Sequence, residues 1–292
     1  MKTIVTHSGN FHSDDVFAVA TLLLVYPDAN VVRTRDEEEI KKADIVVDVG
    51  GEYDPSKKRF DHHQTGGAGK HENGIPYASF GLVWKEYGEK LSGSKEVAKA
   101  IETKLVFFID ALDNGVNISQ NLFEDVRPYT ISDYFYSYWV VGDSEKEHTA
   151  KIFGQVSGLA KEIIKQEIEK AKKIFEETKI VEQVYEQSQD KKIIVLNENL
   201  AWGKVFDNKS ETLAVVYPNN EADTWSAKMV RKGDQTFETR ASFPQAWAGK
   251  TDKELIKISG VPDAVFCHNA RFLAIAKSKE GAIKLAEIAL NA

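Results

Sequence analysis

Two short stretches of the chain place histidine and aspartate side chains directly after a run of β-branched residues. The first run, residues 3–6, is followed closely by His7, His12 and Asp14. The second run, residues 45–47, is followed by a larger set of the same two types: Asp48, Asp61, His62 and His63. Imidazole and carboxylate ligands together suit Mn, Fe or Zn. The residue types therefore indicate a metal centre.

The elements around these residues predict how they come together. Short runs rich in β-branched residues predict strands at 3–6, 30–34 and 44–49, and apolar residues at helical spacing predict helices at 14–26 and 37–42. Alternating strands and helices are typical of a parallel sheet covered by helices. Ligands gather at the carboxyl ends of such strands, so the histidines and acids should converge there. Asp14 has a second interpretation, as an acid that caps the following helix.

The rest of the chain predicts an α/β protein with two domains. Further helices are expected at 77–91, 95–112 and 145–187, and the Gly-rich segment 64–74 is expected to be a flap over the site. Beyond residue 190 the pattern favours strands at 193–196, 212–217, 225–230, 237–243 and 265–266, with a closing helix at 279–290. We therefore predict a parallel-sheet catalytic domain with a helical connector over 1–189. A smaller α+β domain should follow over 190–292, with a cleft between the two.

Four sequence blocks resemble, in order, the signatures of a known superfamily. THSGNFHSDD, VVDVGGEYDP, FDHHQ and IDALDNG are similar to the blocks of the DHH phosphoesterases, and most closely to their melanocyte-proliferating-gene (Myg) branch. Three more stretches support that branch: PYASFGLVWKEYG at 76–88, FPQAWAG at 243–249 and FCHNARFLA at 266–274. The resemblance covers nearly the whole chain. It implies a metal-dependent hydrolase with a catalytic domain and a substrate-gripping domain.

The resemblance also implies a ligand set for two divalent ions. One ion would be held by His7, His12 and Asp48. The other would be held by Asp14, Asp48, His62 and an acid of IDALDNG, so that Asp48 bridges the two. Manganese is the first expectation, with Mg, Co, Fe or Zn as alternatives. The superfamily often has Asp where this chain has His12, and the lost negative charge would favour softer ions.

The acid of IDALDNG is either Asp110 or Asp113. The two are three residues apart and so share one face of a helix. Asp113 is slightly favoured because it adjoins the loop, and the other acid would then be structural. We expect Asp61 to orient a ligand imidazole. We expect His63 to face the substrate phosphate or to protonate the leaving group.

The second domain offers candidate substrate contacts. In FCHNARFLA, His268 and Arg271 would lie at a tight turn after a strand, and Arg240 could join them because its forked donors suit phosphate. An arginine that faces water is an equally good interpretation of Arg240. Trp247 is a candidate for stacking on a nucleic-acid base, although core packing is the commoner use of tryptophan.

Composition limits the class of protein. The 292 residues are 42% hydrophobic and 28% charged, with a net charge of −7 and one cysteine, Cys267. No apolar run approaches the roughly 18 to 20 residues that span a membrane. The start of the chain has no signal-peptide layout. We expect a cytoplasmic protein without a disulfide. An acidic chain is a poor fit to long duplex DNA.

The leading hypothesis is a metal-dependent phosphodiesterase, a 3′-to-5′ exonuclease on short single-stranded RNA, as the Myg resemblance implies. One alternative is a hydrolase of dinucleotides or other small phosphate compounds. Another is a metal-binding regulatory protein without turnover. The oligomeric state stays open, with a homodimer as one candidate.

Overall fold

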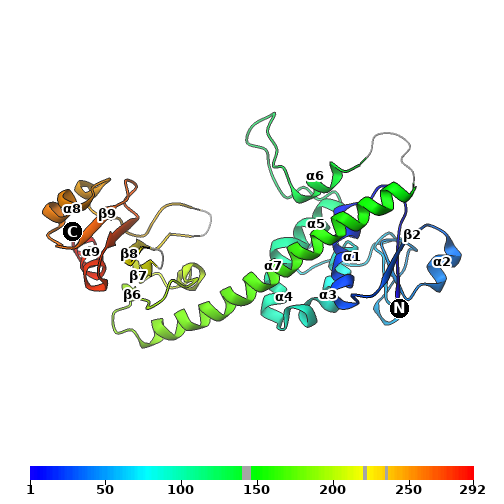
Figure 1. The fold of residues 1–292 in the computed structure, drawn as a ribbon, viewed down its shortest axis with the longest axis horizontal. Helices are drawn as coiled ribbons and strands as arrows, with labels where there is room; N and C mark the ends of the chain where they lie inside the picture. Colours follow the sequence, from blue (N-terminus) through cyan, green and yellow to red (C-terminus); the bar gives the residue numbers. More distant parts are fainter. Residues whose placement is uncertain (140–145, 220–221, 234–235) are drawn as a thin grey trace. The chain divides into compact units, whose positions relative to one another are not determined.

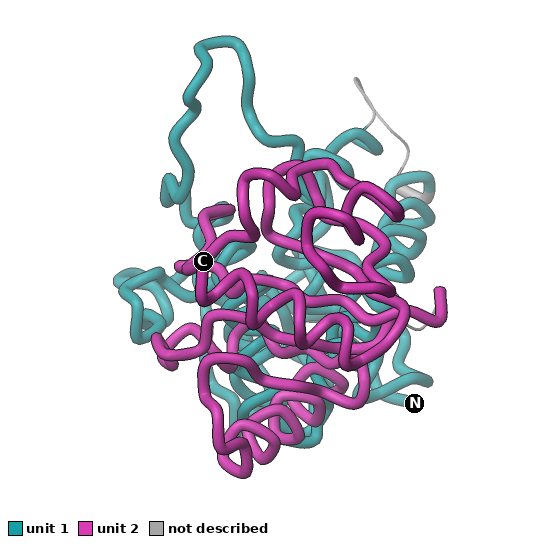
Figure 2. The backbone as a smooth tube through the Cα atoms, turned by 90° about the vertical axis from the view of Figure 1, so that its left-hand side faces the viewer, with its two compact units in different colours: residues 1–172 teal, residues 173–292 magenta. Residues whose placement is uncertain are grey.

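The computed structural model describes residues 1–139, 146–219, 222–233 and 236–292. The chain divides into two compact units, residues 1–172 and 173–292 (Figure 2). Each unit contains, among its described residues, a five-stranded sheet, and the predicted α/β class with two domains is confirmed. The division falls within the long helix α7 (Lys146–Gln187). The domain boundary expected after residue 189 stays a prediction.

The sheet of the first unit has the order β2-β1-β3-β5-β4 (Figure 1). Its strands are β1 (Thr3–Thr6), β2 (Asn30–Arg33), β3 (Ile45–Val47), β4 (Tyr53–Asp54) and β5 (Arg59–Phe60). β1 pairs in parallel with β2 and β3, and β3 pairs in parallel with β5. Only the β4–β5 pairing is antiparallel among these described strands. The carboxyl ends of β1, β3 and β5 therefore lie at one edge of the sheet.

Helices cover this sheet and form the core of the first unit. They are α1 (Ser13–Val25), α2 (Glu37–Lys42), the 3₁₀ turn η1 (Pro55–Lys57), α3 (Ser79–Ser92), α4 (Lys95–Ile101), the π-helical turn η2 (Glu102–Val106), α5 (Phe107–Asp113), α6 (Ile131–Tyr136) and the first part of α7. The first ten residues of α1 are all buried, because α1 packs against α3, α5 and α6. The rings of Phe17 and Phe80 stack at 5.2 Å between α1 and α3. Burial on all sides explains why α1 is apolar around most of its circumference.

The predicted helix at 95–112 differs from the structure in one respect. Its middle is the π turn η2, in which the Phe107 N–H donates to the carbonyl of Glu102, five residues earlier. A π turn adds one residue to a helical turn, and hydrophobic spacing alone does not predict where one falls. The predicted helix at 145–187 is confirmed from residue 146 onward, while residue 145 lies outside the described part of the chain.

The second unit has a mixed sheet of order β6-β7-β8-β10-β9. Its elements are β6 (Ile193–Val195), η3 (Gly203–Phe206), β7 (Ala214–Asn219), β8 (Thr224–Met229), η4 (Gln245–Trp247), α8 (Asp252–Ser259), β9 (Ala264–Cys267), β10 (Leu273–Ala276) and α9 (Lys279–Asn291). β6 runs parallel to β7, and the other pairings are antiparallel.

Alternation along the strands buries both faces of this second sheet. On β7, Ala214 and Val216 belong to a core cluster with residues of α8 and α9. Val215, between them, belongs to a second cluster with residues of α7 and η3. Successive side chains of a strand point to opposite faces, so one strand serves both cores.

One expectation for the second unit is wrong. Residues 237–243 form no strand apart from an isolated bridge between Arg231 and Thr239. Within this segment the Arg240 guanidinium donates to the carbonyls of Lys209 and Phe206. Trp247 is buried and stacks on Phe243, which is the core packing expected more often than stacking on a base. β10 was missed because LAIA contains two alanines, which are depleted in strands.

Candidate metal centre

Three adjacent strands deliver side chains to one edge of the first sheet. His7 follows β1, Asp48 follows β3, and Asp61, His62 and His63 follow β5. These strands are parallel neighbours, so their carboxyl ends meet. The convergence that the sequence predicted is observed for these residues.

The start of α1 supplies the next group of side chains. His12 is the residue before the helix, and its backbone N–H donates to Asp15 Oδ1 at 2.8 Å. Asp14 accepts from the backbone N–H groups of Ser79 and Phe80, at 3.1 and 2.6 Å, at the start of α3. Asp14 therefore caps α3 from a neighbouring helix as well as facing the site, whereas the sequence suggested a cap of its own helix.

The ligand atoms gather in three overlapping groups. Within each group, one atom of every residue lies within 4.8 Å of the others. The groups are His7–His12–Asp48, Asp48–His62–His63 and Asp14–His62–Asp113. The first two groups share Asp48, and the last two share His62.

Asp48 stands at the centre of this arrangement. Its Oδ2 lies 3.3 Å from His7 Nε2, and its Oδ1 lies 3.3 Å from His62 Nε2. The two oxygens thus face different groups, as a bridging carboxylate requires. The backbone of Asp48 is left-handed, with φ of 55°, and Ser79 Oγ donates to its Oδ1 at 3.2 Å. Strained backbone of this kind is concentrated at functional sites.

Two imidazoles present their Nε2 atoms to the acids. His7 Nδ1 lies 3.1 Å from the carbonyl of Ser8. A hydrogen bond from that nitrogen leaves the Nε2 lone pair for a ligand. His62 Nε2 is buried and lacks a hydrogen bond of acceptable geometry, although it lies 3.2 Å from Asp113 Oδ2. Both nitrogens have the placement of metal ligands.

The electrostatics of the site call for a cation. Asp14, Asp15 and Asp48 are all buried, and the Arg33 guanidinium reaches Asp15 only at 4.0 Å. Burial raises the pKa of Asp14 well above its usual range and raises the pKa of Asp15 to about 7. Several buried carboxylates with so little positive charge nearby are costly. A bound divalent ion would offset that cost, so the donor set fits the expected metal.

The neighbouring acids also change the pKa of His62. Burial acts to lower its pKa, but Asp113 and Asp48 outweigh burial and raise the pKa to about 11. A protonated His62 thus substitutes for some of the missing positive charge. For Asp48, burial acts to raise the pKa, but the neighbouring imidazoles of His62 and His7 outweigh it and lower the pKa. Burial lowers the pKa of His12, which favours the neutral form that binds metal.

Asp61 supports His63. Asp61 Oδ1 lies 2.7 Å from His63 Nδ1, and its Oδ2 accepts from the Gly51 N–H at 2.6 Å. The hydrogen bond with Asp61 raises the pKa of His63, whose side chain is 61% exposed. His63 therefore presents an oriented, solvent-facing imidazole beside the candidate ligands.

The structure separates the two acids of α5. Asp113 faces His62 and belongs to one of the three groups. Asp110, which belongs to none of the groups found among the described residues, accepts from the Gly81 N–H at 3.0 Å and lies 2.7 Å from His71 Nε2. A spacing of three residues leaves roughly 60° between two side chains, which is enough to send one toward the site and the other into the core.

The sequence is similar to known proteins along nearly its whole length. The family model of MYG1 exonucleases, described as uncharacterised protein family UPF0160, matches residues 3–290. The chain belongs to this family. It is 30% identical to the MYG1 exonuclease of Bos taurus over 98% of this chain and 84% of that protein. The MYG1 exonuclease of Homo sapiens is also 30% identical, over 98% and 85% of the two chains. The MYG1 protein of Chlamydia muridarum is 30% identical over 96% and 93%.

Some residues around this MYG1-family site were missed by sequence reasoning. Asp15 lies 3.3 Å from His7 Nε2, and its position directly after Asp14 was the available signal. His71 is buried between Asp110 and Glu102, with its Nδ1 3.2 Å from Glu102. This contact fixes one end of the Gly-rich segment 64–74 against α5 and η2.

The candidate substrate residues lie in the second unit of this MYG1-family chain. His268 and Arg271 occupy the turn between β9 and β10, as the sequence predicted, and Arg271 has a left-handed φ of 58°. Arg240 is fully engaged: its guanidinium donates to the carbonyls of four residues, Phe206, Asp207, Lys209 and Thr212. This geometry makes Arg240 a structural residue, so the proposal below includes only His268 and Arg271.

No described helix is long and apolar enough to cross a membrane.

Proposed function

We propose that this chain is a metal-dependent phosphodiesterase, a 3′-to-5′ exonuclease that acts on short single-stranded RNA. The observation that carries the proposal is the set of three ligand groups linked through Asp48 and His62, in a chain of the MYG1 exonuclease family. The order of the sequence blocks, which resembles that of the DHH phosphoesterases, supports the same reaction class.

The proposed ligands follow the overlap of the groups. His7, His12 and Asp48 would hold one divalent ion, and Asp14, Asp48, His62 and Asp113 would hold the second. Manganese is the first candidate. Two such ions would lower the pKa of a bound water, which makes it a better nucleophile, and would neutralise charge on the phosphate.

The protein's own groups would orient the substrate and move a proton. Asp61 holds His63 through Nδ1, which leaves Nε2 directed away from that contact. Asp61 raises the pKa of His63 and so favours its protonated form, which would donate a proton from Nε2 to the leaving oxygen. His268 and Arg271 are proposed to bind a phosphate or the strand.

The test is hydrolysis by metal-stripped protein to which single metals are returned. RNA oligomers labelled at the 3′ or the 5′ end, the dinucleotide pApA and pyrophosphate would be incubated with Mn, Mg, Co or Zn. Asp48→Asn removes the bridging charge. Asp28→Asn, the same change at an exposed position, is the matched control.

We expect stepwise shortening of RNA from the 3′ end that needs metal, persists in Asp28→Asn and disappears in Asp48→Asn. Cleavage of pApA alone would replace the exonuclease with a hydrolase of small nucleotides. Tight metal binding without any cleavage would refute catalysis and leave a metal-binding regulatory protein. Full activity of Asp48→Asn would refute the bridging role.

A further inference from the structure

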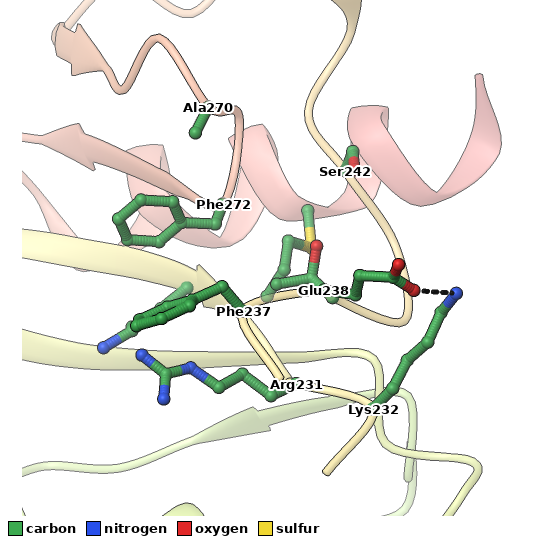
Figure 3. A pocket seen from close by; sticks show the side chains of 10 residues that line it. Arg231, Lys232, Phe237, Glu238, Ser242, Ala270 and Phe272 are labelled. Carbon is green, nitrogen blue, oxygen red and sulfur yellow. Dashed lines mark hydrogen bonds and ion pairs between the residues drawn. The ribbon is translucent and has the colours of Figure 1, made fainter. Parts of the chain in front are cut away.

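The second unit contains a cavity of about 630 Å³ whose lining residues have no role in the reaction proposed above. It is formed by the end of β8, by described residues between 231 and 233 and between 237 and 242, and by the turn between β9 and β10 (Figure 3). Ligand-binding cavities typically have volumes of about 300 to 1,000 Å³. The volume of this cavity lies within that range and is large enough for a single nucleotide.

Two cations of this cavity lack acidic partners. Lys228 and Arg231 both line it, and neither forms an ion pair with an acid of the described residues. Burial and the nearby charge of Arg231 lower the pKa of Lys228. Lys232, in contrast, pairs with Glu238 at 2.9 Å and extends away from Arg231 (Figure 3). In a chain with a net charge of −7, this pair of cations marks a local site for an anion.

Two aromatic rings stand beside these cations. Phe237 is 88% exposed, and the Arg231 guanidinium lies 4.9 Å from its ring centroid. Phe272 comes from the β9–β10 turn and lines the same cavity. Phe237, Phe272 and Arg231 project to the same side of the cavity (Figure 3). One exposed phenylalanine is ordinary on a protein surface, but a phenylalanine that faces a cavity next to unpaired cations provides a stacking surface beside an anion site.

We propose that this cavity binds one nucleoside monophosphate unit. The base would stack on Phe237 and Phe272, as bases do on aromatic side chains in single-strand binders. The phosphate would contact Lys228 and Arg231, whose charged donors suit phosphate oxygens. The choice of a nucleotide over other aromatic anions rests on the proposed exonuclease function. The unit is either a free mononucleotide or the terminal nucleotide of a strand.

The test measures binding without catalysis. The full chain, stripped of metal and kept in chelator, would be titrated calorimetrically with AMP, with adenosine, with inorganic phosphate and with a 5′-phosphorylated RNA tetramer. Phe237→Ala and Arg231→Gln remove the stacking surface and a phosphate contact at exposed positions, so folding should be retained. Ile258→Ala and Lys253→Gln, on the exposed face of α8 in the same unit, are the matched controls.

We expect AMP to bind at least about tenfold more tightly than adenosine or phosphate. Each cavity variant should weaken AMP binding about tenfold, in line with the loss of one stacking or ionic contact, and the controls should leave it unchanged. Preference for AMP over the tetramer would identify a free mononucleotide as the ligand, and the reverse would identify a strand end.

Absence of AMP binding, equal binding of phosphate and AMP, or insensitivity to Phe237→Ala would overturn the proposal. Asp48→Asn should bind AMP like the unmodified chain. Failure of hydrolysis and failure of this cavity to bind nucleotide are therefore separate results.

Discussion

Gly81 on α3 lies where no larger residue fits. A Cβ atom at this position would be 1.8 Å from Asp110 Oδ2 and 3.0 Å from His71 Nε2. Gly81→Ala must therefore displace the Asp110 carboxylate, which would break its hydrogen bond with the Gly81 N–H and its contact with His71. Each of these two hydrogen bonds to a charged carboxylate is worth about 1.5–3 kcal/mol, whereas replacing glycine by alanine within a helix gains about 1 kcal/mol.

The expected net loss of stability is about 2–5 kcal/mol, a large part of the roughly 5–15 kcal/mol that holds a domain folded. It would be measured by urea unfolding of metal-free protein at pH 8, where Asp110, with a pKa that burial raises to about 6, carries its charge. Gly154→Ala is the matched control, because Gly154 lies on exposed α7 with nothing within 4 Å of the new Cβ. That variant should be as stable as the parent or slightly more stable. If Gly81→Ala unfolded at the parent's urea concentration or above it, the packing argument would be refuted.

Three further predictions concern the site and the second unit. Asp113→Asn should weaken manganese binding at least about tenfold while Asp110→Asn mainly lowers the unfolding free energy, and equal losses of metal affinity in calorimetry would contradict the assignment of Asp113. In the folded protein the pKa of Asp15 is raised to about 7 and the pKa of His62 to about 11. Both groups therefore stabilise the folded state at a pH below their unfolded-state pKa values, and this stabilisation is lost as the pH rises through their folded-state pKa values. The melting temperature of metal-free protein should therefore fall from pH 5 to pH 8, and saturating manganese should reduce this fall. A melting temperature that rises with pH in the presence of chelator would contradict the predicted direction. Arg240→Gln should lower stability by about 2–3 kcal/mol, because it removes charged donors from four carbonyls, three of them in partly buried contacts. Metal binding should be unchanged, and an unaltered unfolding curve would count against the structural role of Arg240.

The strand ends were the most predictable part of the site. His7 and Asp48 each follow a short β-branched run, and parallel strands must bring their carboxyl ends to one edge. His62 follows β5, whose residues Arg59 and Phe60 are not β-branched and gave no strand signal. Sequence periodicity is enough to predict that edge, because it depends only on which segments are strands and on their common direction.

Side-chain direction within a helix was harder to predict. Asp110 and Asp113 are close enough in sequence to share a face, and only the packing of α5 against α3 sends Asp110 to Gly81. Asp15 was missed for a related reason. Two adjacent acids at a helix start look alike in sequence, and both turn out to be buried at the site.

The second unit shows where residue type misleads. Arg240 and Trp247 were considered as ligand contacts because of their chemistry, yet one holds backbone carbonyls and the other packs in the core. The exposed Phe237 was assigned to a strand. In each case contacts with residues distant in sequence determine the conformation of the side chain, and the local sequence pattern does not predict such contacts.

The π turn η2 has a consequence for how chain length can vary in this family. It accommodates one residue more than a regular helical turn, so α4 and α5 keep the phase of a continuous helix that is one residue shorter. A relative with a single-residue deletion within 102–106 would therefore still direct its counterpart of Asp113 toward His62. Straightening the segment without a deletion would turn α5 by about 100° and carry Asp113 away. A one-residue gap at this point in an alignment is thus compatible with a working site, and the alignment alone can reveal which relatives have kept the extra residue.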